Sequence, residues 1–134
     1  PRAFTPTCST QQLPGFDELF SKFREVGIDN IYCHAVNDPF VMNAWFEHQN
    51  ITWIRPLPDG NGDLAVQLGM MVQKKNLNFG SRCWRYALIL DGSTGEVLDV
   101  FPEDGFGDNI ETDPYEKSRP EAVLKWAMAN LSEG

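Results

Sequence analysis

The chain has 134 residues, 42% of them hydrophobic, which fits one globular domain over residues 1–134 with its own hydrophobic core. With 11 basic and 19 acidic residues, a formal net charge of −8 and no basic cluster, its composition argues against nucleic acid or an anionic membrane as a partner. No apolar run approaches the roughly 20 residues that cross a bilayer.

The sequence contains three cysteines, Cys8, Cys33 and Cys83, an odd number without a Cys-x-x-Cys pair. This pattern indicates neither a secreted disulfide framework nor a zinc site. We therefore expect a reducing compartment, the cytoplasm, and neither a metal nor an organic cofactor. The chain starts at Pro1 rather than at a Met, so an organellar targeting peptide would lie outside it.

Cys8 is the first candidate functional residue, because Thr-Pro-Thr precedes it and a helix-forming run follows it from Ser9 to Leu13. Unpaired amides and the positive end of the helix dipole favour a thiolate at this position. Both effects lower a thiol pKa and make the sulfur reactive. The alternative is that Cys8 only packs at the helix end as a small apolar residue.

The first helical region is predicted over residues 7–26, where apolar side chains recur at spacings of three and four. Pro14 should kink this helix, and Gly27 should end it. A buried strand is expected over residues 31–36. On that strand Cys33 is interpreted as a core thiol, and His34 points to the opposite face as a packed or dimer-surface residue rather than a catalytic one.

Asp38 is a good N-cap for a helix that ends near His48, a residue expected to face solvent. The run at residues 51–55 predicts a strand. A turn at residues 59–62 should lead into a short helix near residues 64–68. No Gly-Lys-Ser/Thr follows this turn, so it is not interpreted as a phosphate site.

Residues 69–82 should form a small hairpin or loop, with Met70 and Met71 filling the core. Strands at residues 84–90 and 96–101 should pair as a hairpin. Cys83 and Arg85 would then lie on one face of the first of these strands. The polar segment 102–119 is expected to be a surface excursion without chemical consequence, followed by an amphipathic helix over residues 122–131 that closes the fold.

The spacing Pro1-x-x-x-Thr5-x-x-Cys8 resembles the active-site motif of the peroxiredoxins. Ala-Phe-Thr-Pro-Thr-Cys-Ser is similar to the type V (redoxin) branch, including the peroxiredoxin domain of hybrid peroxiredoxin–glutaredoxin proteins. Further matching segments lie at residues 35–41, 58–62 and 80–86, so the resemblance covers most of the chain.

This resemblance implies a thioredoxin-like three-layer α/β sandwich, which fits the predicted order of helices and strands. Relatives have strands before the motif, and here those N-terminal strands are missing. The chain is therefore either a fragment or a natural truncation whose sheet would expose strand edges.

The resemblance also implies a thiol-dependent peroxidase that reduces hydrogen peroxide and alkyl hydroperoxides through a sulfenic acid on Cys8. Arg85 would hold the thiolate and bind peroxide oxygens, Thr5 would hydrogen-bond the peroxide, and Pro1 would shield the site from water. From the residues alone, Thr5 could merely cap a helix, Pro1 shape a turn, and Arg85 be a surface residue.

By the same resemblance, glutathione with glutaredoxin, or thioredoxin, would recycle Cys8, and the protein would form a homodimer. Exposed aromatic side chains are candidates for the dimer surface: Trp45, Trp84 and Phe79. Relatives usually carry a serine-like residue in place of Cys83 and a small one in place of His34. A Cys8–Cys83 disulfide, which needs Cα atoms within about 7 Å, ranks below a one-cysteine cycle.

Two other functions compete with this reading. The first is a non-catalytic or redox-sensing thioredoxin-like module, truncated at its N-terminus. The second is a hydrolase or cysteine transferase, which needs a histidine base for Cys8. Neither His34 nor His48 lies in a motif that supplies one.

Overall fold

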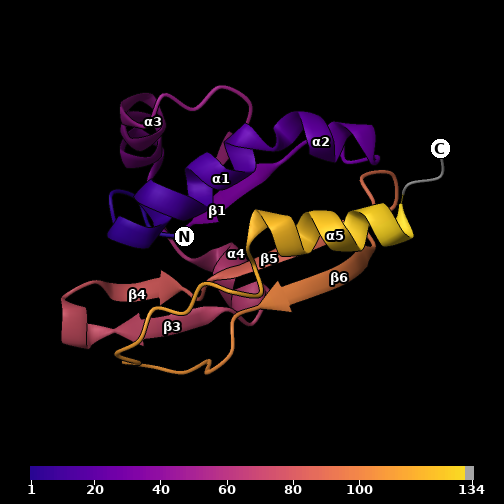
Figure 1. The fold of residues 1–134 in the computed structure, drawn as a ribbon. Helices are drawn as coiled ribbons and strands as arrows, with labels where there is room; N and C mark the ends of the chain where they lie inside the picture. Colours follow the sequence, from indigo (N-terminus) through magenta and orange to yellow (C-terminus); the bar gives the residue numbers. More distant parts are fainter. Residues whose placement is uncertain (132–134) are drawn as a thin grey trace.

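The computed structural model describes residues 1–131, so the last three residues of the predicted domain lie outside the described part. The elements in chain order are η1 (a π-helix, Cys8–Gln12), α1 (Leu13–Glu18), α2 (Phe20–Glu25), β1 (Tyr32–Ala35), α3 (Pro39–His48), β2 (Arg55–Pro58), α4 (Asp63–Gln67), β3 (Met71–Lys74), η2 (a 3₁₀ turn, Lys75–Leu77), β4 (Gly80–Cys83), β5 (Tyr86–Leu90), β6 (Val97–Pro102) and α5 (Pro120–Asn130). Figure 1 shows a mixed α/β fold, in which helices alternate with strands from β1 to β3 and the hairpin of β5 and β6 leads to the closing helix α5.

The first helical region is present but differs from the prediction in where it is interrupted. Its first turns are wound as the π-helix η1, and Leu13 donates its backbone N–H to the carbonyl of Cys8. Pro14 has no N–H to give to residue 10, which favours this wider turn over a simple kink. The axis breaks instead at Leu19, between α1 and α2, and Gly27 at φ +103° follows the end of α2 as expected.

The predicted strand at residues 51–55 is wrong, because β2 begins only at Arg55. The segment just before β2 bonds to the carboxylate of Asp17, on α1. This carboxylate accepts the backbone N–H groups of Thr52 at 3.1 Å, Trp53 at 2.7 Å and Ile54 at 3.2 Å. These amides are therefore not available to a strand ladder. β2 pairs in parallel with β1, and Cys33 stands opposite Pro56.

The two predicted hairpins are present as antiparallel pairs, β3 with β4 and β5 with β6. β5 starts at Tyr86, so the prediction that one strand carries Cys83 and Arg85 on the same face is wrong. Cys83 ends β4 opposite Met71, and Arg85 lies in the connection between the two strands. Within residues 1–131 the ladders form three separate two-stranded sheets, and a hydrogen bond of 2.8 Å between His34 and Tyr86 ties β1 to β5.

The burial of single residues confirms the predictions for Cys33, His34 and His48 and corrects the prediction that Trp45 and Trp84 are exposed. Cys33 and His34 are buried, and His48 is exposed. Trp45 is fully buried and donates its indole N–H to Ser9 at 2.8 Å, while Trp84 is 3% exposed. Neither tryptophan is therefore a surface residue, because both fill the interior beside the helices and strands that hold the site.

The segment between β6 and α5 is not the inert excursion that its polarity predicts. Glu103 is 3% exposed, and its carboxylate accepts hydrogen bonds from the N–H groups of Glu116, Lys117 and Ser118 and from the Ser118 hydroxyl. This buried carboxylate folds the loop back against the strands. The fold of the loop brings Asp113 to the thiol site described next.

Candidate active site

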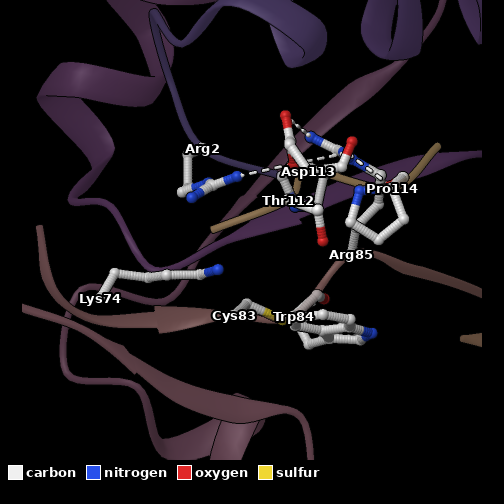
Figure 2. A pocket seen from close by; sticks show the side chains of 9 residues that line it. Arg2, Lys74, Cys83, Trp84, Arg85, Thr112, Asp113 and Pro114 are labelled. Atoms are coloured by element: carbon white, nitrogen blue, oxygen red, sulfur yellow. Dashed lines mark hydrogen bonds and ion pairs between the residues drawn. The ribbon is translucent and has the colours of Figure 1, made fainter. Parts of the chain in front are cut away.

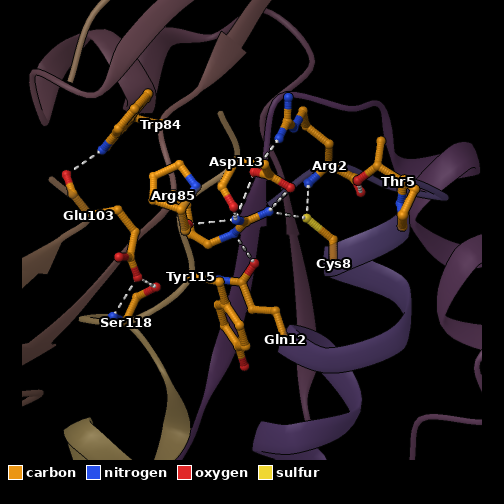
Figure 3. Close-up of polar contacts among 12 residues, drawn as sticks. Arg2, Thr5, Cys8, Gln12, Trp84, Arg85, Glu103, Asp113, Tyr115 and Ser118 are labelled. Carbon is orange, nitrogen blue, oxygen red and sulfur yellow. Dashed lines mark hydrogen bonds and ion pairs between the residues drawn. The ribbon is translucent and has the colours of Figure 1, made fainter. Parts of the chain in front are cut away.

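Cys8 lies at the first turn of η1, and its side chain is fully buried. Two donors reach its sulfur: the backbone N–H of Arg2 at 3.2 Å and the guanidinium Nη2 of Arg85 at 3.4 Å (Figure 3). The tight turn of residues 1–7 brings the first donor, and the connection from β4 to β5 brings the second. The predicted pair Cys8 and Arg85 is therefore assembled in one place.

The charges around Cys8 favour its thiolate. Burial by itself raises the pKa of the thiol, but the positive charge of the Arg85 guanidinium and hydrogen bonding from Thr5 and Arg85 favour the thiolate and lower the pKa. A buried sulfur with a lowered pKa is a nucleophile rather than an inert core thiol. The alternative of a merely packed Cys8 does not explain these partners.

Arg85 is itself fixed on several sides, with its residue only 5% exposed. Its Nε donates to the Gln12 side chain at 3.0 Å, and its Nη1 donates to the Pro114 carbonyl at 2.8 Å. Nη1 also forms an ion pair of 2.7 Å with the Asp113 carboxylate, and the guanidinium lies 5.6 Å from the centre of the Tyr115 ring. The guanidinium can therefore present Nη2 to the sulfur without losing its orientation.

Gln12 and Asp113 are site residues that the sequence analysis missed. Gln12 follows Cys8 by four positions on a helix, a spacing that places both on the same side and could have indicated it. Asp113 lies in an irregular polar loop, where no periodicity gives a signal. Its carboxylate also pairs with Arg2 Nη2 at 3.1 Å, and although burial raises its pKa, hydrogen bonds from Arg85 and the charges nearby lower it overall.

Thr5 and Pro1 lie beside Cys8, as the motif predicts. The Thr5 hydroxyl donates to the carbonyl of Arg2 at 2.7 Å, and the same hydroxyl can turn toward the sulfur, an interaction that favours the thiolate. Pro1 is buried and covers one wall of a small cavity. All four predicted site residues therefore come together, with Thr5 and Pro1 on the turn that leads into η1.

The cavity beside the site has a volume of about 10 Å³, room for about one water-sized molecule. Figure 2 shows the Arg2, Lys74 and Arg85 side chains around it, with Asp113 between the two arginines. Its lining comes from the N-terminal turn, the β3–β4 hairpin, the connection from β4 to β5 and the loop before α5: Pro1, Arg2, Lys74, Cys83, Trp84, Arg85, Thr112, Asp113 and Pro114. Three cations against one carboxylate make it a positively charged space for a small polar molecule.

The other two cysteines are also buried, and all three thiols are free. Cys33 packs in the same apolar cluster as Cys8, and burial raises its pKa to about 12. Cys83 lines the cavity and packs in a different cluster, with Val36 and Ala65. Neither thiol is among the hydrogen-bonding partners of Cys8.

In the part of the chain that the structure describes, no three His, Cys, Asp or Glu side chains gather where they could hold a metal ion. Among the same residues, no helix combines the length and the apolar character that a transmembrane span requires.

Comparison with known proteins shows which family the chain belongs to. The Redoxin family model matches residues 1–114. The chain is 51% identical over 129 residues to a peroxiredoxin of Rhizobium etli, covering 96% of this chain and 71% of that protein. It is 40% identical over 126 residues to the hybrid peroxiredoxin hyPrx5 of Haemophilus influenzae, covering 94% of this chain and half of that protein.

Among solved structures, the antioxidant protein of Plasmodium falciparum, a 1-Cys peroxiredoxin, superposes with a TM-score of 0.91 at 36% identity, covering 96% of this chain and 74% of that one. The thioredoxin-like α/β fold and the enclosed thiol–guanidinium pair define a thiol-dependent peroxidase. The chain belongs to the redoxin family, in its type V peroxiredoxin branch.

Proposed function

We propose that this chain, acting as one domain over residues 1–134, reduces hydrogen peroxide and small alkyl hydroperoxides at Cys8. The observation that carries the proposal is the pair of donors on a buried sulfur, from Arg2 N–H at 3.2 Å and Arg85 Nη2 at 3.4 Å. Donors fixed in this way stabilise the thiolate before substrate arrives and require no rearrangement afterwards. They support a catalytic domain over a non-catalytic or sensing module.

In the proposed reaction the Cys8 thiolate attacks one peroxide oxygen, and a sulfur–oxygen bond forms as the oxygen–oxygen bond breaks. Sulfur is oxidised by two electrons to a sulfenic acid. The second oxygen leaves as hydroxide or alkoxide and takes up a proton to give water or an alcohol. Arg85 binds the developing negative charge, Thr5 hydrogen-bonds the peroxide, and Pro1 keeps water from the sulfur.

Recycling would use a thiol from outside the chain. Glutathione with glutaredoxin, or thioredoxin, would attack the sulfenic acid, release water, and then free Cys8 by thiol–disulfide exchange. This one-cysteine cycle is supported by the contacts of Cys8, whose sulfur accepts hydrogen bonds from Arg2 and Arg85 and, among the described residues, from neither Cys33 nor Cys83. It also agrees with the description of the Plasmodium relative as a 1-Cys peroxiredoxin.

We also propose a cytoplasmic homodimer. Three free thiols suit a reducing compartment. Trp45 and Trp84 are buried, whereas Phe79, the third aromatic residue that the sequence analysis suggested, is partly exposed and stays a candidate for the dimer surface. Phe4, on the turn that leads to Cys8, is 51% exposed, and Phe40, on α3, is 84% exposed, so both are further candidates for this surface.

Replacement of the nucleophile tests the proposal. Cys8→Ser is expected to abolish thiol-dependent consumption of hydrogen peroxide, because serine cannot form a sulfenic acid. Cys33→Ala is the matched control, since it removes another buried thiol of the same cluster and should retain the activity. Retained turnover in Cys8→Ser would show that Cys8 is not the catalytic thiol.

A further inference from the structure

A second buried thiol, Cys83, belongs to a polar cluster that the proposed reaction at Cys8 does not use. The cluster joins the end of β4 to β1, β5 and the turn before α4. The Cys83 sulfur lies 3.7 Å from Nδ1 of His34, whose Nε2 lies 2.9 Å from the Asp59 carboxylate. The Tyr86 hydroxyl lies 2.8 Å from the same Nδ1.

Hydrogen bonding settles which ring nitrogen of His34 carries the proton. Asp59 also accepts from the N–H groups of Leu64 and Ala65, at 3.2 and 2.9 Å, and a carboxylate can only accept. Nε2 must therefore be the donor to Asp59, and in the neutral ring Nδ1 is left as the acceptor. Burial lowers the pKa of His34, against the effect of Asp59, which favours the neutral ring with a free acceptor at Nδ1.

This order of groups is the one that activates a thiol: a sulfur, a neutral imidazole, and a carboxylate that orients the imidazole. The Cys83 thiol now donates to the Trp84 carbonyl at 3.3 Å. Rotation of the S–H bond about the Cβ–Sγ axis turns the same proton toward Nδ1 without moving the sulfur. Burial raises the pKa of Cys83, so the thiol depends on a base to lose its proton.

Cys83 is also one of the residues that line the cavity shared with Arg2 and Arg85, the nearest space from which a small molecule could reach it. The cavity volume of about 10 Å³ leaves room for about one water molecule. Hydrogen peroxide, with only two heavy atoms, needs the least displacement of any peroxide to enter. A bulky alkyl hydroperoxide requires far more space than the cavity offers.

We propose that Cys83 is a second oxidation site, selective for hydrogen peroxide and activated by His34 held by Asp59. As the sulfur attacks one peroxide oxygen, its proton passes to Nδ1 of His34. The oxygen–oxygen bond breaks, and the leaving hydroxide takes that proton back as water. The products are a Cys83 sulfenic acid and one water, with sulfur oxidised by two electrons and the peroxide reduced. The inference rests on the proposed function only in taking hydrogen peroxide as the oxidant.

The test uses the full chain carrying Cys8→Ser, so that the main thiol does not consume the oxidant. This protein is treated with hydrogen peroxide in the presence of dimedone, which traps sulfenic acids, and mass spectrometry measures the labelling of Cys83. Cys33 is an internal control in the same molecule. It is buried on the strand that carries His34, and within residues 1–131 the structure gives its thiol no hydrogen bond. A parallel reaction uses cumene hydroperoxide.

Two variants in the Cys8→Ser background test His34 as the base, one by removing it and one by freeing its Nδ1 from the Tyr86 hydroxyl. His34→Gln removes the base and should slow the labelling of Cys83 on the order of 100-fold. Tyr86→Phe removes the competing donor on Nδ1 and should speed it. A purely structural role for this cluster predicts no increase from the second variant. In chains that keep Cys8, His34→Gln should leave Cys8 oxidation unchanged, which shows that the variant is folded.

The proposal is supported if Cys83 is labelled well above Cys33, by hydrogen peroxide far faster than by cumene hydroperoxide, and with the two opposite variant effects. It is overturned if Cys83 is labelled no more than Cys33, or equally fast without His34. Should His34→Gln fail to fold, a Tyr86→Phe rate equal to or below that of its parent overturns it. Oxidation of Cys8 in the unmodified chain is measured separately, so failure of the peroxidase proposal is distinguishable.

Discussion

Nη2 of Arg85 lies 3.4 Å from the Cys8 sulfur, although 77 positions separate the two residues in the sequence. The guanidinium reaches the sulfur from the connection between β4 and β5, while Gln12 and Asp113 hold it from η1 and from the loop before α5. Three distant segments therefore determine one contact. The predictions below separate the charge of Arg85 from its orientation and from the stability of the loop.

Replacement of the guanidinium tests its charge. Arg85→Ala should raise the pKa of Cys8, because a nearby cation that favours the thiolate is lost. It should also slow oxidation by hydrogen peroxide on the order of 100-fold, the typical cost of losing one fixed donor in an active site. Rates of alkylation against pH give the pKa, and stopped-flow mixing gives the oxidation rate. Arg55→Ala, at an exposed position on β2, is the control and should change neither quantity.

Asp113→Asn tests the orientation of the guanidinium, since it removes the 2.7 Å ion pair to Nη1 but keeps the side-chain volume. Peroxide oxidation should slow by up to about 100-fold as Nη2 moves away from the sulfur. The pKa of Cys8 should rise much less than in Arg85→Ala, because the guanidinium charge stays in the site and a neighbouring negative charge is removed. A rise as large as that of Arg85→Ala would contradict a positioning role. Asp104→Asn, which loses only a surface pair with Lys117, is the matched control.

Glu103 should stabilise the loop that carries Asp113. Glu103→Gln is expected to lower the free energy of unfolding by about 2 kcal/mol, since bonds to a buried carboxylate are replaced by weaker or unpaired ones. Denaturant unfolding at neutral pH measures the difference. Glu111→Gln, at an exposed position of the same loop, should be neutral.

The contribution of Glu103 should also depend on pH. Burial by itself raises the pKa of this carboxyl, but hydrogen bonds from Ser118, Glu116 and Lys117 lower it below its usual 4.5. The unfolded chain therefore binds the proton first, so the stabilisation is complete above about pH 4.5 and is lost as the pH falls through the folded pKa. The difference in stability between the wild type and Glu103→Gln should shrink at acidic pH. A constant difference down to acid unfolding would show that the carboxylate charge is not its source.

Much of the fold follows from local patterns in the sequence. Asp38 caps α3 as expected and accepts the N–H of Val41 at 2.8 Å, and both hairpins have the predicted order of strands. The strand expected at residues 51–55 failed because its amides bond to Asp17, and periodicity carries no information about so distant a partner. Tertiary hydrogen bonds overrode a correct estimate of β propensity.

The candidate site, like the fold, was predictable from the sequence only in part. Cys8, Thr5 and Pro1 lie within one motif, and Arg85 was found because a second matching segment carries it. Gln12 was detectable from its spacing to Cys8. Asp113 was not, because the loop that carries it is positioned by Glu103, a charged residue whose burial nothing in its local sequence indicates. The same limit applies to Cys83 and His34, which lie 49 positions apart in the sequence and meet only in the folded chain.

Stopped-flow mixing of the reduced chain with hydrogen peroxide, followed by mass spectrometry of the quenched protein, tests the central claim most directly. We predict fast oxidation confined at first to Cys8, through a sulfenic acid that glutathione or thioredoxin reduces. A rate for Cys8 no higher than that of an unstructured thiol peptide would contradict the account. It would mean that the donors from Arg2 and Arg85 do not activate the sulfur.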